Sequence, residues 1–332
     1  MTRLRFAQFG TGHGHAAGKL TAMLNNSDVE VAGVFESDAS RRSALDKPGS
    51  AYHGVRWYSS EQELLGDPSV VGVASEGRND ESLGQTLSIV RAGKHVWYDK
   101  PAGDSWDGWQ EVVAEARARK LLIQMGYMFR YHEGFAEITR LARTGVLGKI
   151  FSIRAQMSTS LDVAARQVIA QHRGGIFYDL AGHMIDQIVW LLGRPTEVTS
   201  FFRQDGGSVP GFADNTHGVL SFPGALATID ISAIEPPPMA RRFEVYGLTG
   251  SAIMEPFEPS GAIRLCLTKD VGALKAGVQM IPVRKQSRQD LYDAELVAFV
   301  ARLRGHPPPE HTFEHDLVVQ ETLLRLTGGI VA

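Results

Sequence analysis

A short apolar run that stops at two closely spaced glycines constrains the fold of this chain more than any other feature. Residues 4–9 are mostly apolar, Gly10-Thr11-Gly12 follows, and helical spacing of apolar residues begins at His15. A buried parallel strand that ends in a glycine turn and leads into a helix is typical of a dinucleotide-binding domain. The first glycine makes the tight turn, and the second lets the backbone approach a pyrophosphate at the helix N-terminus.

This glycine motif is incomplete, because His15 stands where the third glycine is usual. We interpret His13 and His15 as loop residues close to the phosphates rather than as metal ligands, and we expect no bound metal. The alternative interpretation is a plain strand-to-helix turn without a ligand.

Strand-like and helical segments alternate up to about residue 125. This rhythm indicates crossover connections and a parallel sheet that is covered on both faces. We therefore predict a Rossmann-type α/β domain over residues 1–125. The expected strands are residues 4–9, 29–35, 70–74, 95–98 and 121–125, and the expected helices are residues 15–24, 83–92 and 106–119.

The pattern changes after residue 126, where strand-like segments follow one another with short connections that contain Gly or Pro. Such connections favour an antiparallel sheet, so we predict an α+β domain over residues 126–332. A ligand cleft between two such domains is a common outcome. The expected strands are residues 150–157, 198–202, 217–222, 225–231, 242–246, 251–254 and 263–267, and the expected helices are residues 135–143, 179–192, 290–304 and 314–326.

Length and composition fit two globular domains and exclude several classes of function. The 332 residues are 43% hydrophobic and 21% charged, and the net charge of -3 gives no basic excess for nucleic acid. No apolar run reaches the length of a membrane span. The single cysteine, Cys266, rules out an intramolecular disulfide. We expect a cytoplasmic protein that binds neither nucleic acid nor membrane.

Glu36 ends the second expected strand and indicates which dinucleotide binds. A carboxylate at this position accepts both hydroxyls of the adenosine ribose and repels a 2′-phosphate, so we expect NAD. Asp38 is the rival acid. Arg41 or Arg42 would instead accept a 2′-phosphate, which leaves NADP open.

A lysine follows the fourth expected strand, in the sequence Asp99-Lys100-Pro101. Ligands collect beyond the carboxyl ends of parallel strands. Next to an oxidised nicotinamide cation the pKa of Lys100 would fall, so this side chain could donate or accept a proton. A solvated surface lysine is the alternative interpretation.

An acid and a histidine share one face of an otherwise apolar helix. Asp179 and His183 are four residues apart, and Asp186 follows three residues later. The pair fits general acid–base chemistry at a substrate hydroxyl. A buried pair with a purely structural role is one alternative. Zinc is another, although no compact ligand pattern supports it.

Taken in order, these motifs resemble the Gfo/Idh/MocA oxidoreductases over essentially the whole chain. The resemblance implies an NAD(P)-binding Rossmann domain and a C-terminal domain with an open, mainly antiparallel sheet. It also implies reversible hydride transfer between the nicotinamide and a secondary alcohol of a sugar, cyclitol or related polyol. The motifs are Gly10-Thr11-Gly12, residues 92–96 leading to Asp99-Lys100-Pro101, residues 126–132, residues 174–183, and Asp214 leading to Gly224-Ala225.

The resemblance further implies the roles of individual residues. Lys100, Asp179 and His183 become the catalytic residues, with His183 as the base at the reacting hydroxyl. Arg130 and His172 are candidates for substrate binding, and a solvated loop is the alternative for His172. The expected cofactor-binding residues are Gly10, Thr11, Gly12, His13, His15, Glu36, Asn79, Asp99 and Lys100.

Several positions depart from the family pattern. Asp99 replaces the glutamate before the lysine. In the Thr-Pro-Asn-x-x-His stretch after the third strand, Asn79 matches, but Arg78 replaces the proline and Ser82 replaces the histidine.

The family also implies a homodimer or homotetramer that forms through the C-terminal sheet.

Two other functions stay open at this point. Some relatives use a tightly held NAD as a hydride shuttle for redox-neutral glycoside cleavage or epimerisation. The fold also serves as a non-catalytic regulator that senses a nucleotide or a sugar. The joint presence of Lys100, Asp179 and His183 argues against a pure sensor.

Overall fold

The computed structural model describes residues 2–306 and 311–330. The chain forms two compact units, and neither is one continuous stretch of sequence. The first comprises Met1–Met128 and Arg288–Leu317, and the second comprises Phe129–Ser287 and Val318–Ala332. The sequence analysis placed residues 288–317 in the second domain, whereas the structure assigns them to the first unit.

The first unit contains a five-stranded parallel sheet in the order β2-β1-β3-β4-β5. The strand order reverses at β1, so the carboxyl ends of β1 and β3 flank a topological switch point, where ligands bind in such sheets. The expected strand at residues 70–74 begins two residues later, at Gly72. The strands are β1 (Leu4–Phe9), β2 (Val29–Phe35), β3 (Gly72–Ser75), β4 (His95–Tyr98) and β5 (Ile123–Met125).

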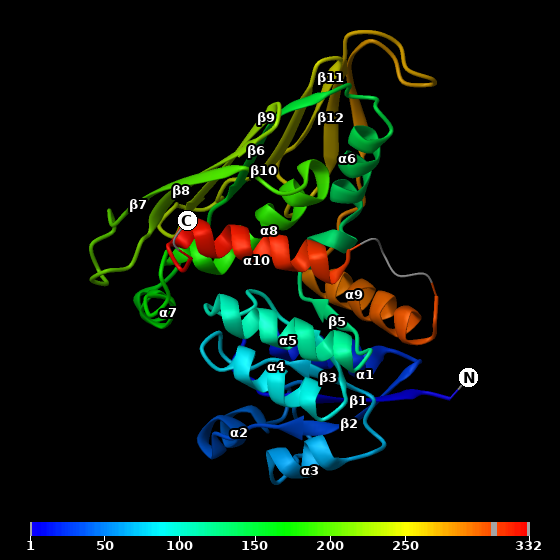
Figure 1. The fold of residues 1–332 in the computed structure, drawn as a ribbon, viewed down its shortest axis with the longest axis vertical. Helices are drawn as coiled ribbons and strands as arrows, with labels where there is room; N and C mark the ends of the chain where they lie inside the picture. Colours follow the sequence, from blue (N-terminus) through cyan, green and yellow to red (C-terminus); the bar gives the residue numbers. More distant parts are fainter. Residues whose placement is uncertain (1, 307–310, 331–332) are drawn as a thin grey trace. The chain divides into compact units, whose positions relative to one another are not determined.

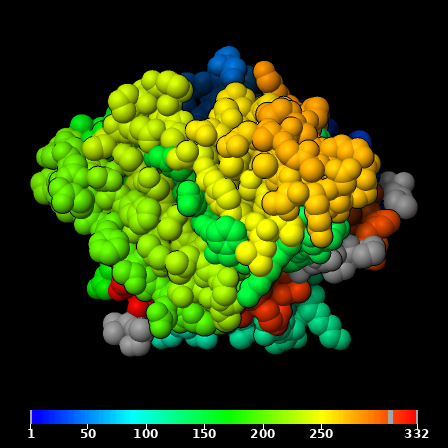
Figure 2. All heavy atoms as spheres, turned by 90° about the horizontal axis from the view of Figure 1, so that it is seen from above, coloured from blue at the N-terminus to red at the C-terminus, as the bar shows by residue number. Residues whose placement is uncertain are grey.

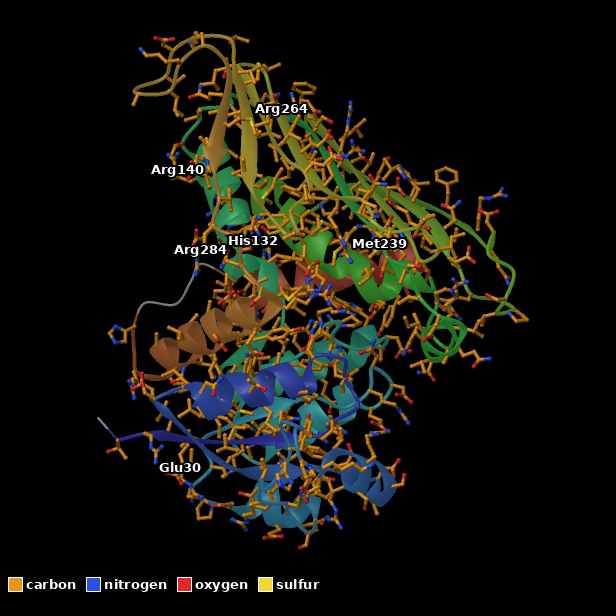
Figure 3. All side chains as sticks on the ribbon, turned by 180° about the vertical axis from the view of Figure 1, so that it is seen from behind. Glu30, His132, Arg140, Met239, Arg264 and Arg284 are labelled. Atoms are coloured by element: carbon orange, nitrogen blue, oxygen red, sulfur yellow. The ribbon has the colours of Figure 1, made fainter. Side chains whose placement is uncertain are left out.

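Helices cover both faces of this sheet. Figures 1 and 3, which look from opposite sides, show α4 and α5 on one face and α1 and α9 on the other. The two short helices α2 and α3 were not predicted. Asp38 and Ser60 cap them by accepting hydrogen bonds from backbone N–H groups of their first turns. The helices are α1 (Ala16–Asn25), α2 (Ala39–Leu45), α3 (Glu61–Gly66), α4 (Ser82–Arg91), α5 (Trp106–Ala118) and α9 (Arg288–Leu303).

Helix α9 belongs to the first unit because it packs on α1. The rings of Phe6 and Phe299 meet edge to face at 5.6 Å. A Cβ atom on Gly18 would lie 2.6 Å from the ring of Tyr292, so only glycine permits this approach of the two helices. The Gln289 side chain also donates a hydrogen bond to the Gly18 carbonyl at 3.1 Å.

The second unit contains an eight-stranded sheet in the order β13-β12-β11-β10-β6-β9-β8-β7. Among the neighbouring strands of this second sheet, within the described residues, only the β6–β9 pair is parallel. The expectation of a mainly antiparallel sheet is therefore confirmed. The strands are β6 (Ile150–Met157), β7 (Glu197–Arg203), β8 (Asn215–Phe222), β9 (Ala225–Ser232), β10 (Arg241–Gly247), β11 (Gly250–Met254), β12 (Ala262–Leu267) and β13 (Gly277–Pro282).

One face of this sheet is covered by α8 and α6, and the other face is open. Phe201, Leu226, Val278 and Met280 are exposed on it, although Val and Leu on the strands usually pack inside. Figure 2 looks onto this face, where the strands run from green to orange, and Figure 3 marks Arg264 on β12. The remaining elements are η1 (Met128–Tyr131), α6 (Glu133–Arg143), α7 (Val163–Ile169), α8 (Ile176–Leu192) and α10 (Phe313–Thr327).

Across residues 2–306 and 311–330, no helix is both long enough and apolar enough to cross a membrane.

Candidate functional site

The turn after β1 has the conformation that the glycine motif predicts. Gly10 has a φ of +82°, which side chains rarely allow. A Cβ atom on Gly10 would lie 2.6 Å from the backbone nitrogen of Gly77 in the turn after β3. Glycine is therefore required here for two reasons, and the two turns of the switch point approach each other at backbone distance.

The carboxylate of Glu36 is tied to this turn. Its Oε2 accepts hydrogen bonds from the Thr11 N–H at 3.0 Å and from the Arg41 guanidinium at 3.2 Å. Its Oε1 accepts a hydrogen bond from the Asp38 N–H at 2.9 Å. Burial raises the pKa of Glu36, but the hydrogen bonds from Thr11 and Asp38 and the charge of Arg41 hold it below its ordinary value. The expected ribose ligand is thus ionised and fixed beside the turn.

The two rival residues near Glu36 have structural partners of their own. Asp38 caps α2 by accepting hydrogen bonds from the Ser40 and Arg41 N–H groups. The guanidinium of Arg41 lies against Glu36, so the positive charge next to the turn is paired.

The stretch after β3 also differs from the family pattern in its contacts. Arg78 forms ion pairs with Asp80 at 3.1 Å and Glu81 at 2.8 Å, so its charge is compensated within its own turn. Ser82 is buried, and its hydroxyl lies 3.2 Å from that of Tyr98. Asn79 is half-buried at the start of this turn.

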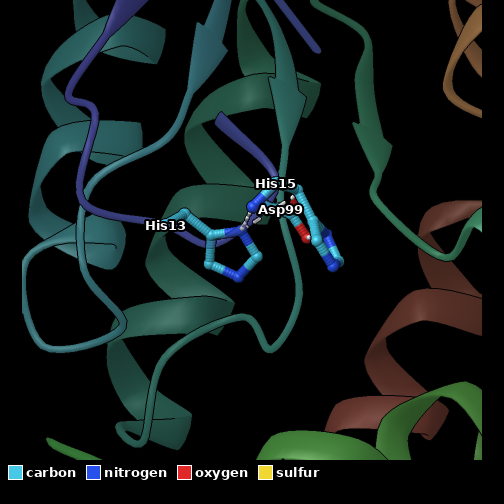
Figure 4. Close-up of side chains that lie close together, drawn as sticks. All are labelled: His13, His15 and Asp99. Atoms are coloured by element: carbon cyan, nitrogen blue, oxygen red, sulfur yellow. Dashed lines mark hydrogen bonds and ion pairs between the residues drawn. The ribbon is translucent and has the colours of Figure 1, made fainter. Parts of the chain in front are cut away.

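Asp99 stands at the end of β4 and gathers several partners on its carboxylate (Figure 4). Its Oδ2 lies 3.0 Å from His15 Nδ1, 3.3 Å from His13 Nδ1 and 3.0 Å from Lys19 Nζ. Its Oδ1 accepts a hydrogen bond from the Lys100 N–H at 2.7 Å. A Cβ atom on Gly126 would lie 2.8 Å from the same Oδ1, so the carboxylate is enclosed by backbone.

Behind Asp99 lies a buried group of charges that no sequence motif announced. Lys19, Glu76 and Glu295 are each 0% exposed. Lys19 Nζ lies 3.1 Å from Glu76 Oε1 and 4.5 Å from the centre of the Trp97 ring. Burial lowers the pKa of Lys19, but Asp99, Glu76 and Glu295 outweigh this effect and raise it. The lysine is therefore a buried ammonium.

The pKa values of the three acids in this group shift in opposite directions. Burial raises the pKa of Glu76 to about 7 and that of Glu295 to about 8. Burial also opposes the ionisation of Asp99, but the positive charges of His13, His15 and Lys19 hold its pKa well below the ordinary value. Asp99 is therefore the carboxylate that carries the negative charge.

The two histidines also differ from each other. Burial lowers the pKa of His15 to about 4, although Asp99 opposes the change. For His13 burial acts in the same direction, but attraction to Asp99 and the hydrogen bond with it raise the pKa above the ordinary value. His15 is therefore neutral near pH 7.

Lys100 is not a solvated surface lysine, since it is only 3% exposed. Its position two residues after the end of β4 puts it at the carboxyl edge of the sheet, next to Asp99. Asp99, which stands where the family pattern has glutamate, thus still provides a carboxylate that accepts a hydrogen bond from the Lys100 N–H.

In the second unit, two glycines set the start of α8. Gly174 and Gly175 have φ values of +88° and +53°, and the Ile176 N–H donates a hydrogen bond to the Ala213 carbonyl at 3.0 Å. The helix therefore begins at Ile176, three residues before the expected start, and Asp179 lies in its first turn. His183 is 2% exposed, and its ring meets that of Phe129 at 5.1 Å.

The two candidate substrate residues are engaged within the second unit. Arg130 makes a two-pronged ion pair with Asp186, with nitrogen–oxygen distances of 2.6 and 3.0 Å, and Asp186 is 0% exposed. His172 is buried and stacks on the ring of Tyr178 at 4.6 Å. A solvated loop is therefore wrong for His172.

The structure thus gathers the predicted cofactor residues of the first unit at the carboxyl edge of one sheet, and places Asp179 and His183 on one helix of the second unit. Sequence analysis missed Lys19, Glu76 and Glu295. Lys19 could have been found from its spacing of four residues from His15, which puts both on one helix face. Glu76 could have been found from its position directly after β3. Glu295 lies on α9, far along the chain, and has no local signal.

Comparison with family models agrees with this arrangement. Residues 4–127 match the model of the oxidoreductase family with an NAD-binding Rossmann fold. Residues 135–253 match the Gfo/Idh/MocA C-terminal domain. The two matches together span most of the chain and follow each other in the order that the resemblance implied.

Individual relatives are distant but extend over most of the chain. A 1,5-anhydro-D-fructose reductase from Ensifer adhaerens is 25% identical over 86% of this chain and 84% of its own length. Inositol 2-dehydrogenase 2 from Saccharopolyspora erythraea is 29% identical over 82% of this chain and 77% of its own. The structure of an NAD binding oxidoreductase from Klebsiella pneumoniae superposes with a TM-score of 0.83 at 18% identity, covering 99% of this chain and 97% of that one. This chain belongs to the Gfo/Idh/MocA family of oxidoreductases with an NAD-binding Rossmann fold.

Proposed function

We propose that this chain transfers a hydride reversibly between a nicotinamide dinucleotide and a secondary alcohol of a sugar, cyclitol or related polyol. The observation that carries the proposal is the β1 turn, in which Gly10 has a positive φ, abuts Gly77 and is linked through Thr11 to Glu36. A tight glycine turn with an ionised acid at the end of the next strand fits a pyrophosphate and an adenosine ribose.

The residues of the first unit fit the cofactor in detail. Gly10, Thr11 and Gly12 would hold the pyrophosphate at the start of α1. Glu36 would accept the ribose hydroxyls, and its pairing with Arg41 reduces the positive charge that a 2′-phosphate would seek. His13, His15, Asn79, Asp99 and Lys100 complete the proposed cofactor-binding set. NAD is therefore the proposed cofactor, ahead of NADP.

When bound, the nicotinamide supplies the hydride acceptor or donor. The proposal gives the protein three tasks at the alcohol oxygen. His183, buried in the second unit, removes the hydroxyl proton as general base. Lys100 polarises the same oxygen, and Asp179 in the first turn of α8 orients the histidine or balances its charge. In the reverse direction His183 returns the proton.

The substrate class is supported by the relatives. One is named as a reductase of 1,5-anhydro-D-fructose and another as a dehydrogenase of inositol. Both names describe a polyhydroxylated ring with a carbonyl or secondary alcohol. We extend this class, and no single substrate, to the present chain.

Titration of NADH and NADPH into purified, cofactor-free protein tests the proposal through nicotinamide fluorescence. We expect tight binding of NADH and weak binding of NADPH, followed by turnover of a sugar or polyol with NAD. Tighter binding of NADPH would contradict the role of Glu36 and favour Arg41 or Arg42. If folded protein binds neither nucleotide, the proposal is overturned.

A further inference from the structure

Arg78 stands in the turn after β3, where the family pattern has proline. We propose that the flat face of its guanidinium stacks on the adenine ring of the dinucleotide, and that the acids paired with it repel a 2′-phosphate. The inference rests on the proposed function and adds to it a residue that recognises the base. It makes Arg78 a determinant of the choice between NAD and NADP.

Arg78 and Arg41 both border the second glycine of the β1 turn. A Cβ atom on Gly12 would lie 2.6 Å from Arg78 Cγ and 3.1 Å from Arg41 Nη1. The stem of Arg78 therefore packs on the glycine turn from the side of β3, and the guanidinium of Arg41 reaches the same place from α2. Since Arg41 Nη1 also lies 3.2 Å from Glu36 Oε2, the two arginines, Gly12 and Glu36 are neighbours.

The other parts of the dinucleotide determine where its adenine ring lies. In the proposed function the pyrophosphate lies at Gly12 and the adenosine ribose at Glu36. The adenine ring is joined directly to that ribose, so it occupies the space next to Glu36. Arg78 is close to the same carboxylate, because its hydrogen bond with Asp80 and the charges of Glu81, Asp80 and Glu36 raise its pKa.

The partners of Arg78 leave the faces of its guanidinium available. Asp80 accepts hydrogen bonds from Nε at 3.1 Å and from Nη2 at 3.2 Å, and Glu81 Oε1 lies 2.8 Å from Nη2. Carboxylates bind a guanidinium along its edge, whereas an aromatic ring stacks on its face. The side chain keeps 42% of its surface exposed, so a ring can reach it. The pairing also orients the guanidinium before the ligand binds, which lowers the entropy cost of stacking.

The charges around Arg78 favour a neutral ring over a phosphate. Arg78 and Arg41 are two cations, and they face the three acids Glu36, Asp80 and Glu81. A phosphate monoester brings nearly two further negative charges near pH 7. Like charges repel, so this group disfavours the 2′-phosphate of NADP. An adenine ring is uncharged and meets no such repulsion.

Substitution of Arg78 tests the stacking through NADH binding to full-length, cofactor-free protein, measured by nicotinamide fluorescence. Arg78→Ala removes the flat face, so NADH should bind about 10-fold more weakly, the size of effect that one stacked base contributes. Arg78→Lys keeps the charge without the flat face and should bind as weakly as Arg78→Ala. Arg78→Tyr supplies a flat ring without the charge and should bind NADH within about 3-fold of the wild type.

The paired acids are tested by Asp80→Asn/Glu81→Gln, which leaves the charge of Arg78 uncompensated. We expect the affinity for NADPH to rise about 5-fold relative to that for NADH, because the 2′-phosphate then meets a net positive side chain. Adding Arg78→Ala to the double variant should remove this gain. An unchanged ratio of the two affinities in the double variant would contradict the role of the acids.

Arg91→Ala is the matched control. Arg91 is another arginine of the first unit, in the last turn of α4, and its side chain is 51% exposed and paired with Glu111. This variant should bind NADH and NADPH like the wild type. Circular dichroism checks that every variant is folded.

The inference is overturned if Arg78→Ala binds NADH as tightly as the wild type. It is also overturned if Arg78→Lys keeps the affinity that Arg78→Tyr loses, because charge rather than stacking would then be responsible. In either case a wild type that binds NADH leaves the proposed function standing. If the wild type itself binds no NADH, both fail.

A crystal structure of the protein with NAD gives a second test. An adenine ring about 3.5–4 Å from the plane of the Arg78 guanidinium supports the stacking. A ring that lies away from Arg78 excludes it.

Discussion

The side chain of Lys19 shows how much of this unit depends on one charge. Its ammonium lies between Glu76 and Asp99 and is fully buried. Removing one partner of a buried ion pair leaves the others without compensation, which costs more than the pair contributes. Lys19 is therefore a residue that the fold requires, even though the family motifs do not include it.

Lys19→Met keeps the length of the side chain and removes its charge. We expect the free energy of unfolding to fall by about 3–5 kcal/mol, because Asp99 and Glu76 lose their common partner. Chemical denaturation measures the change. The exposed Lys47→Met serves as the control and should stay within about 0.5 kcal/mol of the wild type. An equal effect of both substitutions would contradict the interpretation.

Glu295 gives the same cluster a pH dependence with a definite sign. Its pKa of about 8 means that the folded chain holds a proton that the unfolded chain releases above about pH 4.3. The free energy of unfolding should therefore decrease as the pH rises from about 5 to 8, by at most about 1.4 kcal/mol per pH unit for this proton.

Glu295→Gln keeps a neutral side chain at every pH, so it should flatten this part of the stability curve. Denaturation at a series of pH values compares the variant with the wild type and with the exposed Glu111→Gln. The control should keep the slope of the wild type. A slope that is unchanged in Glu295→Gln would show that the proton sits elsewhere.

Lys100 and His183 are the residues whose replacement tests the chemistry. Lys100→Met and His183→Ala should each lower turnover by about 10²-fold or more while NADH still binds, since general acid–base groups contribute effects of this size. Steady-state kinetics on the polyol identified by screening measures turnover, and fluorescence measures binding. Near-normal turnover in both variants would refute the assigned roles.

Among the elements, the buried strands of the first unit could be predicted and the short helices could not. Residues 4–9, 29–35 and 95–98 form strands as expected, because an apolar run between turn residues has few alternatives. Helices α2, α3 and α7 have six or seven residues each, which is too short for a helical pattern to repeat. Their caps decide their existence instead.

The candidate site likewise contains residues that the sequence predicts and residues that it does not. Gly10, Glu36 and Lys100 follow strand ends, so a parallel sheet brings them to one edge and the sequence pattern suffices. The charge cluster combines residues of α1 and α9 with the residues directly after β3 and β4, and its contacts depend on how these elements pack. No periodic pattern in one segment records such a contact.

The start of α8 depends on Gly175. A Cβ atom there would lie 2.5 Å from the Ala213 carbonyl oxygen, in addition to the cost of a positive φ. We expect Gly175→Ala to lower the free energy of unfolding by clearly more than the roughly 1–2 kcal/mol of backbone strain alone. Gly145→Ala, with a φ of +76° and nothing within 4 Å, measures that strain and is the control. Equal losses would argue against the clash.

At the scale of the whole molecule, the open face of the eight-stranded sheet is the surface that stands out. Alternate residues on its strands leave Phe201, Leu226, Val278 and Met280 between 55% and 66% exposed. An extended face with exposed large apolar side chains is typical of an interface between protein chains. This supports the proposal of a homodimer or homotetramer that forms through this sheet.

Leu226→Arg tests the interface. Light scattering after gel filtration should give two or four times the 36.3 kDa of the chain for the wild type and a lower mass for the variant. A buried charge at an interface is strongly unfavourable. Val297→Arg replaces an equally exposed residue on α9 and should keep the mass of the wild type. A monomeric wild type would exclude the assembly.

The packing of α9 on α1 has a consequence for how the protein is made. A ribosome releases the five strands of the first sheet early, but α9 leaves it only after about residue 303 has been added. Until then the Phe6 side of the sheet lacks the ring of Phe299. The first unit therefore cannot finish folding until α9 has emerged behind the whole second sheet, and a nascent chain that stalls within the second sheet exposes an incomplete core.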